Sequence, residues 1–144
     1  MVHEHQIALI QLHSPLTNRL IWMPPGGGVK VGESLTDCVK REIQEECGLQ
    51  VEVHNLMYVT ELILPKAHVL EFYFRCEYLS GTLSLGEDPE RAKAILRQAQ
   101  WLPLEQISMQ QNLHPAFLRE RLIGDLASQN QAPFFFKTAD SIHQ

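Results

Sequence analysis

The sequence predicts a mixed α+β domain, and three observations carry this prediction. Residues 69–78 alternate apolar and polar side chains as a half-buried strand does. Residues 34–47 carry an amphipathic helical pattern with clear start and stop signals. Strand patterns precede that helix, and more strands and a second helix follow it. With 144 residues, 44% of them hydrophobic, we expect residues 1–144 to form one domain, with residues 127–144 an extension whose packing is left open.

Two strands before the helix lead the chain into a glycine-rich loop. Residues 6–12 place apolar side chains on both faces, which is typical of a buried strand. Residues 13–18 contain Ser, Pro and Asn and predict a turn, and residues 20–23 predict a second short strand. The glycines that follow allow the backbone to approach a ligand closely: Gly26, Gly27, Gly28 and Gly32.

The helix itself has a strong start and a strong stop. Ser34 is followed three residues later by Asp37, a capping-box-like start in which the side chains serve unpaired amide N–H groups. Gly48 stands where helices end in a left-handed residue. We therefore expect a helix from about Ser34 to Cys47. Its apolar stripe consists of Leu35, Val39, Ile43 and Cys47.

Three glutamates gather on one patch of this helix. Glu42, Glu45 and Glu46 are spaced i, i+3 and i+4, and Glu42 and Glu46 project beside the apolar side. Like charges one turn apart repel each other, and acids near a helix C-terminus oppose its dipole. Two interpretations remain open at this point. Either these are solvated surface acids, with Glu46 paired to a lysine, or they bind Mg²⁺ or Mn²⁺, which prefer oxygen ligands.

A pair of strands follows the helix. Residues 51–64 are rich in β-branched and aliphatic side chains, and Pro65-Lys66-Ala67 interrupts them before the clear strand at 69–78. Ser80-Gly81 predicts a turn that closes a hairpin onto residues 82–83.

The polar loop at residues 86–90 offers two more acids. Glu87 and Glu90 are candidates for a further metal ligand or for the base that orients an attacking water. A solvated acidic loop with no function is the alternative.

The C-terminal third predicts one more strand and one more helix. Residues 100–104 form the last strand, with Trp101 packed and Pro103 at its end. A helix that covers the sheet is indicated by Pro115, Phe117, Leu118, Leu122 and Leu126. The apolar segment Phe134–Phe136 either packs back on the domain or contacts a second subunit, which leaves a homodimer open.

The charge, hydropathy and cysteine content of the chain limit the classes of function that it can have. The net charge of −5 argues against non-specific binding of nucleic acid. No apolar run reaches about 18 residues, and the N-terminus lacks the pattern of a signal peptide, so we expect a cytoplasmic protein without a membrane partner. The three cysteines, Cys38, Cys47 and Cys76, are odd in number and lack metal-ligand spacing, so we expect them to be reduced.

The loop and helix together resemble a known family signature. Gly27 is followed after five residues by Glu33, and after seven more by Arg41-Glu42-Ile43; one residue then separates this triplet from Glu45-Glu46, and one more precedes Gly48-Leu49. This 23-residue pattern is similar at all nine specified positions to the Nudix box of the Nudix hydrolases. The resemblance implies an α/β/α sandwich with a mixed β-sheet, in which the box forms a loop-helix-loop.

The resemblance also implies a metal-dependent pyrophosphohydrolase and assigns its ligands. Glu42, Glu45 and Glu46 would bind Mg²⁺ or Mn²⁺, and the Gly27 carbonyl would complete the ligand set. Bound cations would also provide the positive charge that an anionic diphosphate needs in an acidic protein.

Further roles follow from the same resemblance. Arg41 and Glu33 would pair to hold the loop against the helix. Family members commonly place a glutamate on a loop at about the distance of Glu87, which favours it as a further ligand or as the base. Glu45 is the first choice for the base that takes the proton of water, Glu87 is the rival, and the sequence does not separate them.

The expected substrate is a nucleoside diphosphate linked to another group X. ADP-ribose-cleaving members often carry a proline 15 or 16 residues past the box, and Pro65 follows Leu49 by 16 residues. Candidate substrate contacts are Gly28, Pro65, His68 and Tyr73, with Tyr58 and Phe72 as further aromatic candidates. Two alternatives remain: a pyrophosphohydrolase that removes nucleoside triphosphates, and a module that senses nucleotides without turnover.

Overall fold

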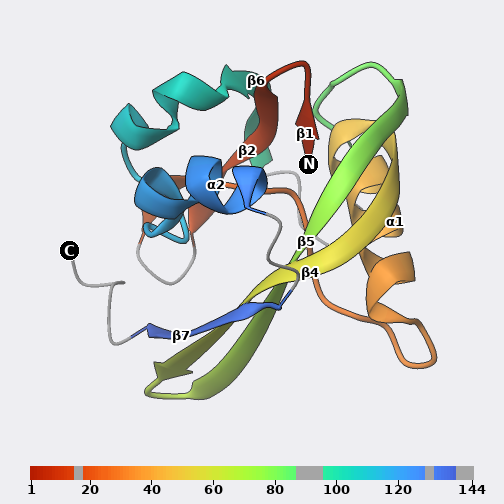
Figure 1. The fold of residues 1–144 in the computed structure, drawn as a ribbon. Coiled ribbons are helices and arrows are strands. Elements are labelled where there is room, and N and C mark those ends of the chain that lie inside the picture. The colour runs from red at the N-terminus through yellow and green to blue at the C-terminus, as the bar shows by residue number, and fades with distance from the viewer. Residues whose placement is uncertain (15–17, 87–95, 129–131, 139–144) are drawn as a thin grey trace.

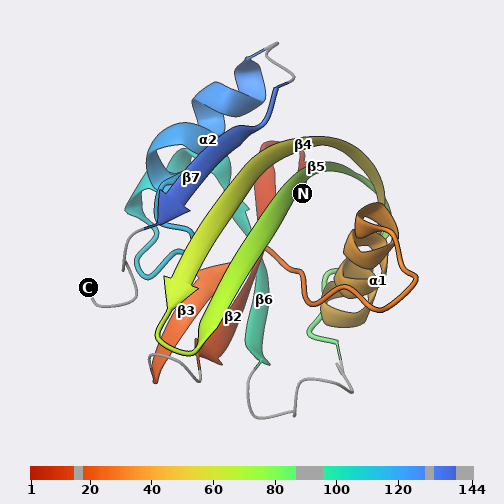
Figure 2. The same cartoon turned by 90° about the horizontal axis from the view of Figure 1, so that it is seen from below.

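The structure, a computed structural model, describes residues 1–14, 18–86, 96–128 and 132–138. The elements in chain order are β1 (Val2–His3), β2 (Gln6–Ser14), β3 (Arg19–Met23), α1 (Leu35–Cys47), β4 (Leu49–Leu64), β5 (Ala67–Gly81), β6 (Leu96–Pro103), the 3₁₀ helix η1 (Leu104–Met109), α2 (Leu118–Ala127) and β7 (Phe134–Thr138). Seven strands form one sheet in the order β3-β2-β1-β5-β4-β7, with β6 paired to β2. Figure 1 and Figure 2 show α1 on one side of the sheet and α2 with η1 on the other.

The sheet is mixed, and this confirms the predicted α+β sandwich. β1 runs parallel to β5 and β4 runs parallel to β7, whereas the other pairs are antiparallel. β2 separates the two halves of the core because it is apolar on both faces, as predicted. One cluster joins Ala8, Ile10 and Leu12 to Ile43 and Cys47 of α1. The other joins Ile7 and Leu9 to η1 and α2 through Ile107, Leu118 and Leu122.

The helix α1 begins and ends where the sequence predicts. Ser34 is its N-cap, and the Ser34 hydroxyl accepts a hydrogen bond from the Asp37 N–H at 3.1 Å. Gly48 ends the helix in the left-handed region, with φ of 70°. The predicted stripe is correct at Ile43 and Cys47, which are buried, whereas Leu35 is 40% exposed at the first turn.

The predicted hairpin onto residues 82–83 is wrong. β5 continues to Gly81, which pairs with Leu49 of β4, and residues 82–86 are not a strand. Instead, the N–H groups of Ser84 and Gly86 donate to the carbonyls of Cys47 and Glu46 at 3.0 and 2.9 Å. The last carbonyls of a helix have no intrahelical donors, so this segment caps α1 rather than adding a strand.

The C-terminal region differs from the prediction in its last element. The strand expected at 100–104 is present as β6. It is not the last strand of the chain, since β7 follows it and pairs with β4 at the sheet edge. Pro115 precedes α2, which starts at Leu118, and the sequence did not predict η1.

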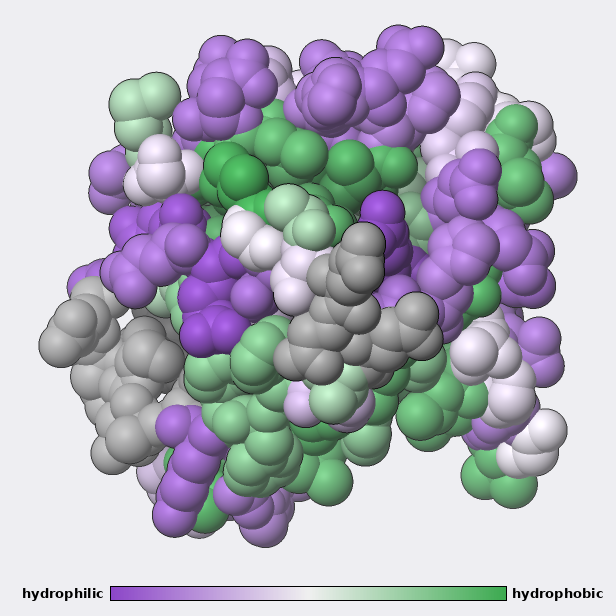
Figure 3. Space-filling view, in the orientation of Figure 1, coloured by the Kyte–Doolittle hydropathy of each residue, from purple (hydrophilic) through white to green (hydrophobic). Residues whose placement is uncertain are grey.

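The apolar segment at the C-terminus does pack back on the domain. Phe134 and Phe136 join the core cluster around Tyr58, whereas Phe135 is 63% exposed. Figure 3 shows hydrophobic side chains gathered in the lower part of this face, where Figure 1 places β7 and the far end of the β4–β5 hairpin.

Candidate active site

The glycine loop between β3 and α1 lies directly against the acidic face of the helix. The Gly26 N–H donates to Glu46 Oε2 at 2.9 Å. Gly27 packs so closely on the Glu42 carboxylate that a Cβ at this position would overlap it, whereas a Cβ at Gly28 would meet nothing within 4 Å. A side chain at position 27 would therefore force the Glu42 carboxylate to move away from the loop and from Arg41.

Two of the three helix carboxylates are buried. Glu42 is 3% exposed and Glu46 is 0% exposed, while 28% of the Glu45 side chain is exposed. Helical periodicity turns Glu42 and Glu46 inward together with Ile43 and Cys47. Ionised carboxylates in such positions need hydrogen-bond donors or a cation, so Glu42 and Glu46 are not solvated surface acids.

Arg41 joins the loop to the helix and bonds three carboxylates at once. Its Nε and Nη2 donate to the two oxygens of Glu33 at 2.7 and 3.1 Å. Its Nη1 donates to Glu42 Oε1 at 2.7 Å and to Glu45 Oε2 at 3.1 Å. Its Nη2 also donates to the Gly28 carbonyl at 3.1 Å. The Arg41–Glu33 pair expected from the sequence is present, and in this structure Arg41 also holds Glu42 and Glu45.

Both members of the Arg41–Glu33 pair titrate far from their ordinary ranges. Hydrogen bonds from Arg41, with a smaller contribution from the Lys30 N–H, lower the pKa of Glu33 to about 2. The same Glu33 contact raises the pKa of Arg41 above its usual value, and Glu42 adds to the effect. Both groups are therefore charged at neutral pH, and the loop is fixed to α1 by a bidentate ion pair.

The donor atoms of this cluster suit a hard divalent cation. In the described part of the chain, no three His, Cys, Asp or Glu side chains are already arranged as a metal site. However, Glu42 Oε1 and Glu45 Oε2 both approach one cationic atom, Arg41 Nη1, at 2.7 and 3.1 Å. Three carboxylates sharing one guanidinium leave a formal charge of −2 on Glu33, Arg41, Glu42 and Glu45. Carboxylate oxygens carrying such excess charge fit Mg²⁺ or Mn²⁺.

Comparison with known proteins agrees with this geometry. The model of the NUDIX domain matches residues 2–122, which include the glycine loop and all of α1. The chain belongs to the Nudix family. The resemblance of its loop and helix to the Nudix box is therefore part of a match over most of the domain.

Relatives of this Nudix domain carry two different names. An NAD-capped RNA hydrolase, NudC, from Pseudomonas aeruginosa is 40% identical over 79 residues, which are 55% of this chain and 26% of that protein. An ADP-ribose pyrophosphatase from Methanocaldococcus jannaschii is 37% identical over 71 residues, 48% of this chain and 42% of that protein. The crystal structure of the MutT protein from Methanosarcina mazei Go1 has a TM-score of 0.64 at 26% identity, over 84% of both chains. The chain spans about a quarter to two fifths of the length of the two curated relatives.

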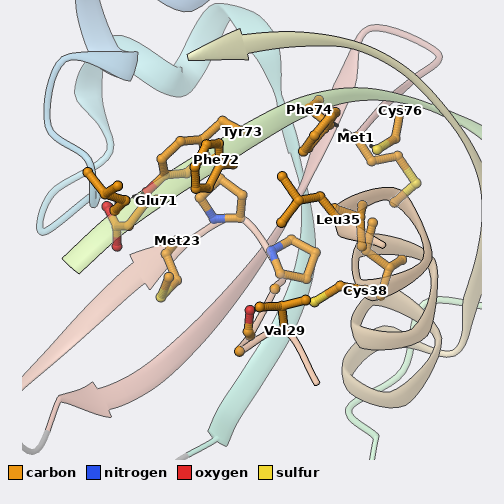
Figure 4. Close-up of a pocket in the computed structure, with 18 of the residues that line it drawn as sticks. Met1, Met23, Val29, Leu35, Cys38, Glu71, Phe72, Tyr73, Phe74 and Cys76 are labelled. Atoms are coloured by element: carbon orange, nitrogen blue, oxygen red, sulfur yellow. Dashed lines mark hydrogen bonds between the residues drawn. The ribbon is translucent and has the colours of Figure 1, made fainter. Parts of the chain in front are cut away.

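A cavity of about 530 Å³ adjoins the glycine loop of this Nudix domain. Its walls come from the loop, from α1 and from residues 69–74 and Cys76 of β5. Figure 4 shows Leu35 and Cys38 of α1 on one side of the cavity and Glu71 and Tyr73 of β5 on the other. The size and the mainly apolar lining are those of a small-molecule site.

The structure brings together some of the predicted substrate contacts and separates others. Gly28, Phe72 and Tyr73 line the cavity. Pro65 and His68 lie at the turn between β4 and β5, outside the lining, where His68 Nε2 is 2.7 Å from Glu61 Oε1. Tyr58 is 1% exposed and belongs to the core.

The sequence missed a polar cluster at the far end of the cavity. The Glu71 carboxylate accepts hydrogen bonds from Thr60 Oγ1 at 2.8 Å and from the Tyr73 hydroxyl at 3.0 Å, and its oxygens lie 3.2 Å from His114 Nε2. Glu71 occupies an ordinary polar position of the alternating strand pattern, so the sequence held no signal that separated it from Arg75 or Glu77.

The predicted role of Glu87 is not tested, because this residue and Glu90 lie outside the described residues. Gly86, immediately before Glu87, donates to the Glu46 carbonyl. Gly86, the last described residue before it, therefore lies beside the C-terminal end of α1.

The cysteines are free, as the sequence predicts. Cys38, Cys47 and Cys76 are all buried. Burial raises the pKa of the Cys47 thiol to about 12, with the neighbouring Glu46 charge adding to the shift. Among the described residues, no helix is both long enough and apolar enough to span a membrane.

Proposed function

We propose that this chain is a Mg²⁺- or Mn²⁺-dependent pyrophosphohydrolase that cleaves a nucleoside diphosphate linked to X into a nucleoside monophosphate and phosphorylated X. One observation supports this most directly: two buried carboxylates, Glu42 and Glu46, face a glycine loop that also borders the cavity. A nucleotide in the cavity would bring its diphosphate to the loop, beside the cation site.

The roles of the side chains follow from their exposure and contacts. Glu42, Glu45 and Glu46, with the Gly27 carbonyl, would hold the cation. When bound, a divalent cation polarises phosphoryl oxygens and lowers the pKa of a coordinated water. Arg41 and Glu33 keep the loop in place, so that Gly26 and Gly27 stay in contact with Glu46 and Glu42.

Glu45 is our proposed base, and Glu87 is the rival. Glu45 is the most exposed of the three helix carboxylates, so it is the one best placed to take a proton from a water molecule that enters from solvent. The comparison of Glu45→Gln with Glu87→Gln separates the two. The base variant should lose kcat with little change in KM, and a steeper loss in Glu87→Gln would assign the role to Glu87.

The favoured substrate is an ADP-ribose-type nucleotide. One relative is named ADP-ribose pyrophosphatase, and the other is named for NAD-capped RNA, so a dinucleotide or an RNA-linked diphosphate is also open. The sequence-based expectation that excluded nucleic acid is therefore too narrow, although the net charge of −5 disfavours extensive contacts to an RNA backbone. The reduced, buried cysteines suit a cytoplasmic location.

A panel of nucleotides tests the proposal. ADP-ribose, NAD, NAD-capped RNA, other nucleoside diphosphate derivatives and nucleoside triphosphates would be incubated with Mg²⁺ or Mn²⁺, and the products identified by mass. We expect AMP and ribose 5-phosphate from ADP-ribose. Pyrophosphate from triphosphates, with ADP-ribose untouched, would instead support a role in removing nucleoside triphosphates. Binding without turnover of any compound would support a nucleotide-sensing module.

A homodimer remains part of the proposal. Phe135 on the edge strand β7 is 63% exposed, and Leu70 of β5 is 52% exposed. Analytical ultracentrifugation of the wild type and of Phe135→Ser would test the homodimer. We expect the wild type to dimerise and the substitution to weaken the dimer; two monomeric proteins would rule out a homodimer.

A further inference from the structure

Glu71 is a carboxylate inside a mainly apolar cavity, and it is not part of the Nudix box. It lines the cavity together with Tyr73, on the side opposite the first turns of α1 (Figure 4). The surrounding walls include Met23, Phe72 and Phe74. Its side chain is 24% exposed, so the charge is partly hydrated, and its buried part needs hydrogen-bond donors.

Three donors contact the Glu71 carboxylate, and most of their contacts are to one of its two oxygens. Oε2 accepts from Thr60 at 2.8 Å, from Tyr73 at 3.0 Å and lies 3.2 Å from His114 Nε2. Among the described residues, the contact at Oε1 is to the same His114 nitrogen, at 3.2 Å. A carboxylate oxygen can accept about two hydrogen bonds. Oε1 therefore keeps capacity for a donor brought by a ligand.

The network also keeps Glu71 charged. Burial by itself raises the pKa of this carboxyl, but the His114, Thr60 and Tyr73 contacts outweigh burial, and the net pKa lies below its ordinary value. Burial and the Glu71 charge raise the pKa of Tyr73, so its hydroxyl remains a donor. At neutral pH the cavity thus contains a fixed, ionised acceptor.

We propose that Glu71 reads the nucleoside part of the substrate by accepting a hydrogen bond from it. This inference rests on the proposed function and narrows its substrate class. The donor is an exocyclic amino group of the base, as in adenine or cytosine, or a ribose hydroxyl. The apolar side chains around Glu71 suit a base ring, and a base with a carbonyl in place of the amino group would set two acceptors against each other.

Thr60, Tyr73 and His114 act as positioning residues in this account. Thr60 is 0% exposed, and the His114 N–H donates a hydrogen bond to the Trp22 carbonyl at 2.7 Å. The carboxylate is therefore fixed from β4, β5 and the segment before α2. A purely structural role, joining these three segments, would predict lost stability without any change in ligand preference.

Binding of matched mononucleotides, measured by calorimetry without metal, distinguishes the two roles. AMP and CMP carry an exocyclic amino group where IMP and UMP carry a carbonyl, so these two pairs test recognition of the base. Comparison of AMP with its 2′- and 3′-deoxy forms tests recognition of the ribose hydroxyls. We expect the wild type to prefer one amino-bearing base, or the ribose form, by about tenfold or more. Glu71→Gln should lose that preference, because its amide can donate as well as accept.

Glu77→Gln is the matched control. Glu77 lies on the same strand, contacts His54 Nε2 at 3.1 Å, and is outside the cavity lining, so the preference should be unchanged. Should Glu71→Gln fail to fold, Glu71→Asp withdraws the carboxylate by one methylene and should reduce the preference.

Several results would overturn the proposal. These are a wild type that binds both members of every pair equally, a wild type that binds none, and a preference that survives in Glu71→Gln. Because the assay needs neither metal nor turnover, it is separate from the test of catalysis. A Glu71-dependent preference in a protein that hydrolyses nothing would sustain this inference and remove the proposed function.

Discussion

Two carboxylate clusters in this domain are built in opposite ways. Around Arg41, one guanidinium is shared by three carboxylates, Glu33, Glu42 and Glu45. Around Glu71, one carboxylate receives contacts from three donors, Thr60, Tyr73 and His114. The first cluster has an excess of negative charge, and the second has its charge well bonded. On our proposal the α1 cluster uses its excess negative charge to take up a cation, whereas the Glu71 carboxylate already has its donors and is a fixed acceptor.

The largest effect that tests this contrast is expected in the α1 cluster. Glu46→Gln should lower turnover by at least about 100-fold, since even residues that only orient metal ligands cost 10- to 100-fold. The fold should remain intact or become slightly more stable, because repulsion with Glu42 is relieved and the glutamine can still accept from the Gly26 N–H. Steady-state kinetics and thermal unfolding check both parts. Glu52→Gln, an exposed acid paired with Lys40, is the control. Unchanged turnover in a folded Glu46→Gln would remove the metal assignment.

The contact between loop and helix gives the next largest effect. Gly27→Ala places a methyl group into the Glu42 carboxylate, so we expect a loss of about 1–3 kcal/mol in the free energy of unfolding, together with reduced activity. Denaturant unfolding would measure the loss. Gly28→Ala is a matched control, because its Cβ meets nothing within 4 Å and its stability should be unchanged. Equal stability of the two variants would show that the loop does not press on Glu42.

The Glu71 cluster should respond to the loss of a donor. Thr60→Val removes a hydroxyl that is 0% exposed and should cost about 1–2 kcal/mol. It should also raise the pKa of Glu71. Because the folded pKa of this group is lowered, its contribution to stability is present at neutral pH and is lost as the pH falls below the unfolded value. The decrease in the free energy of unfolding between pH 7 and pH 4 should therefore be smaller in Thr60→Val than in the wild type. Denaturant unfolding of both proteins at the two pH values measures it. An unchanged pH dependence would contradict the network.

The smallest effect concerns the Arg41–Glu33 ion pair, whose side chains are 19% and 14% exposed. The pKa of Glu33 is lowered to about 2 from an ordinary value of 4.5, so its stabilising contribution is complete above about pH 4.5 and disappears as the pH falls towards 2. Unfolding free energies of the wild type and Glu33→Gln should therefore differ at pH 6 and converge near pH 2. Parallel curves over this range would show that Glu33 contributes nothing through its charge.

How far the sequence could predict each cluster also differs. The α1 cluster lies within one helix, where a period of 3.6 residues places Glu42, Glu45 and Glu46 on one patch and the caps at Ser34 and Gly48 are local signals. The same periodicity put Glu42 and Glu46 beside the apolar side but left open whether they are buried or solvated, which the structure decides. What the sequence could not give was the position of Arg41, which bonds Glu42 and Glu45 as well as Glu33.

The Glu71 cluster was out of reach because it depends on long-range pairing. Thr60 and Glu71 meet through the register of β4 and β5, which contains three irregularities between Gln50 and Tyr58. His114 arrives through backbone bonds to Trp22, 92 residues earlier. Register shifts move side chains between faces, and local patterns do not report them. The missed β7 has the same cause, because its partner β4 is distant in the chain.

The acidic face of α1 is proposed to take up a divalent cation, and binding of Mn²⁺ is the sharpest test of this proposal. Titration of the protein with Mn²⁺, followed by the electron paramagnetic resonance signal of the free ion, needs no substrate. We expect the wild type to remove Mn²⁺ from solution, and Glu42→Gln and Glu46→Gln to bind it at least about tenfold more weakly. Equal affinity in all three proteins, or no binding by the wild type, would show that these carboxylates are not cation ligands.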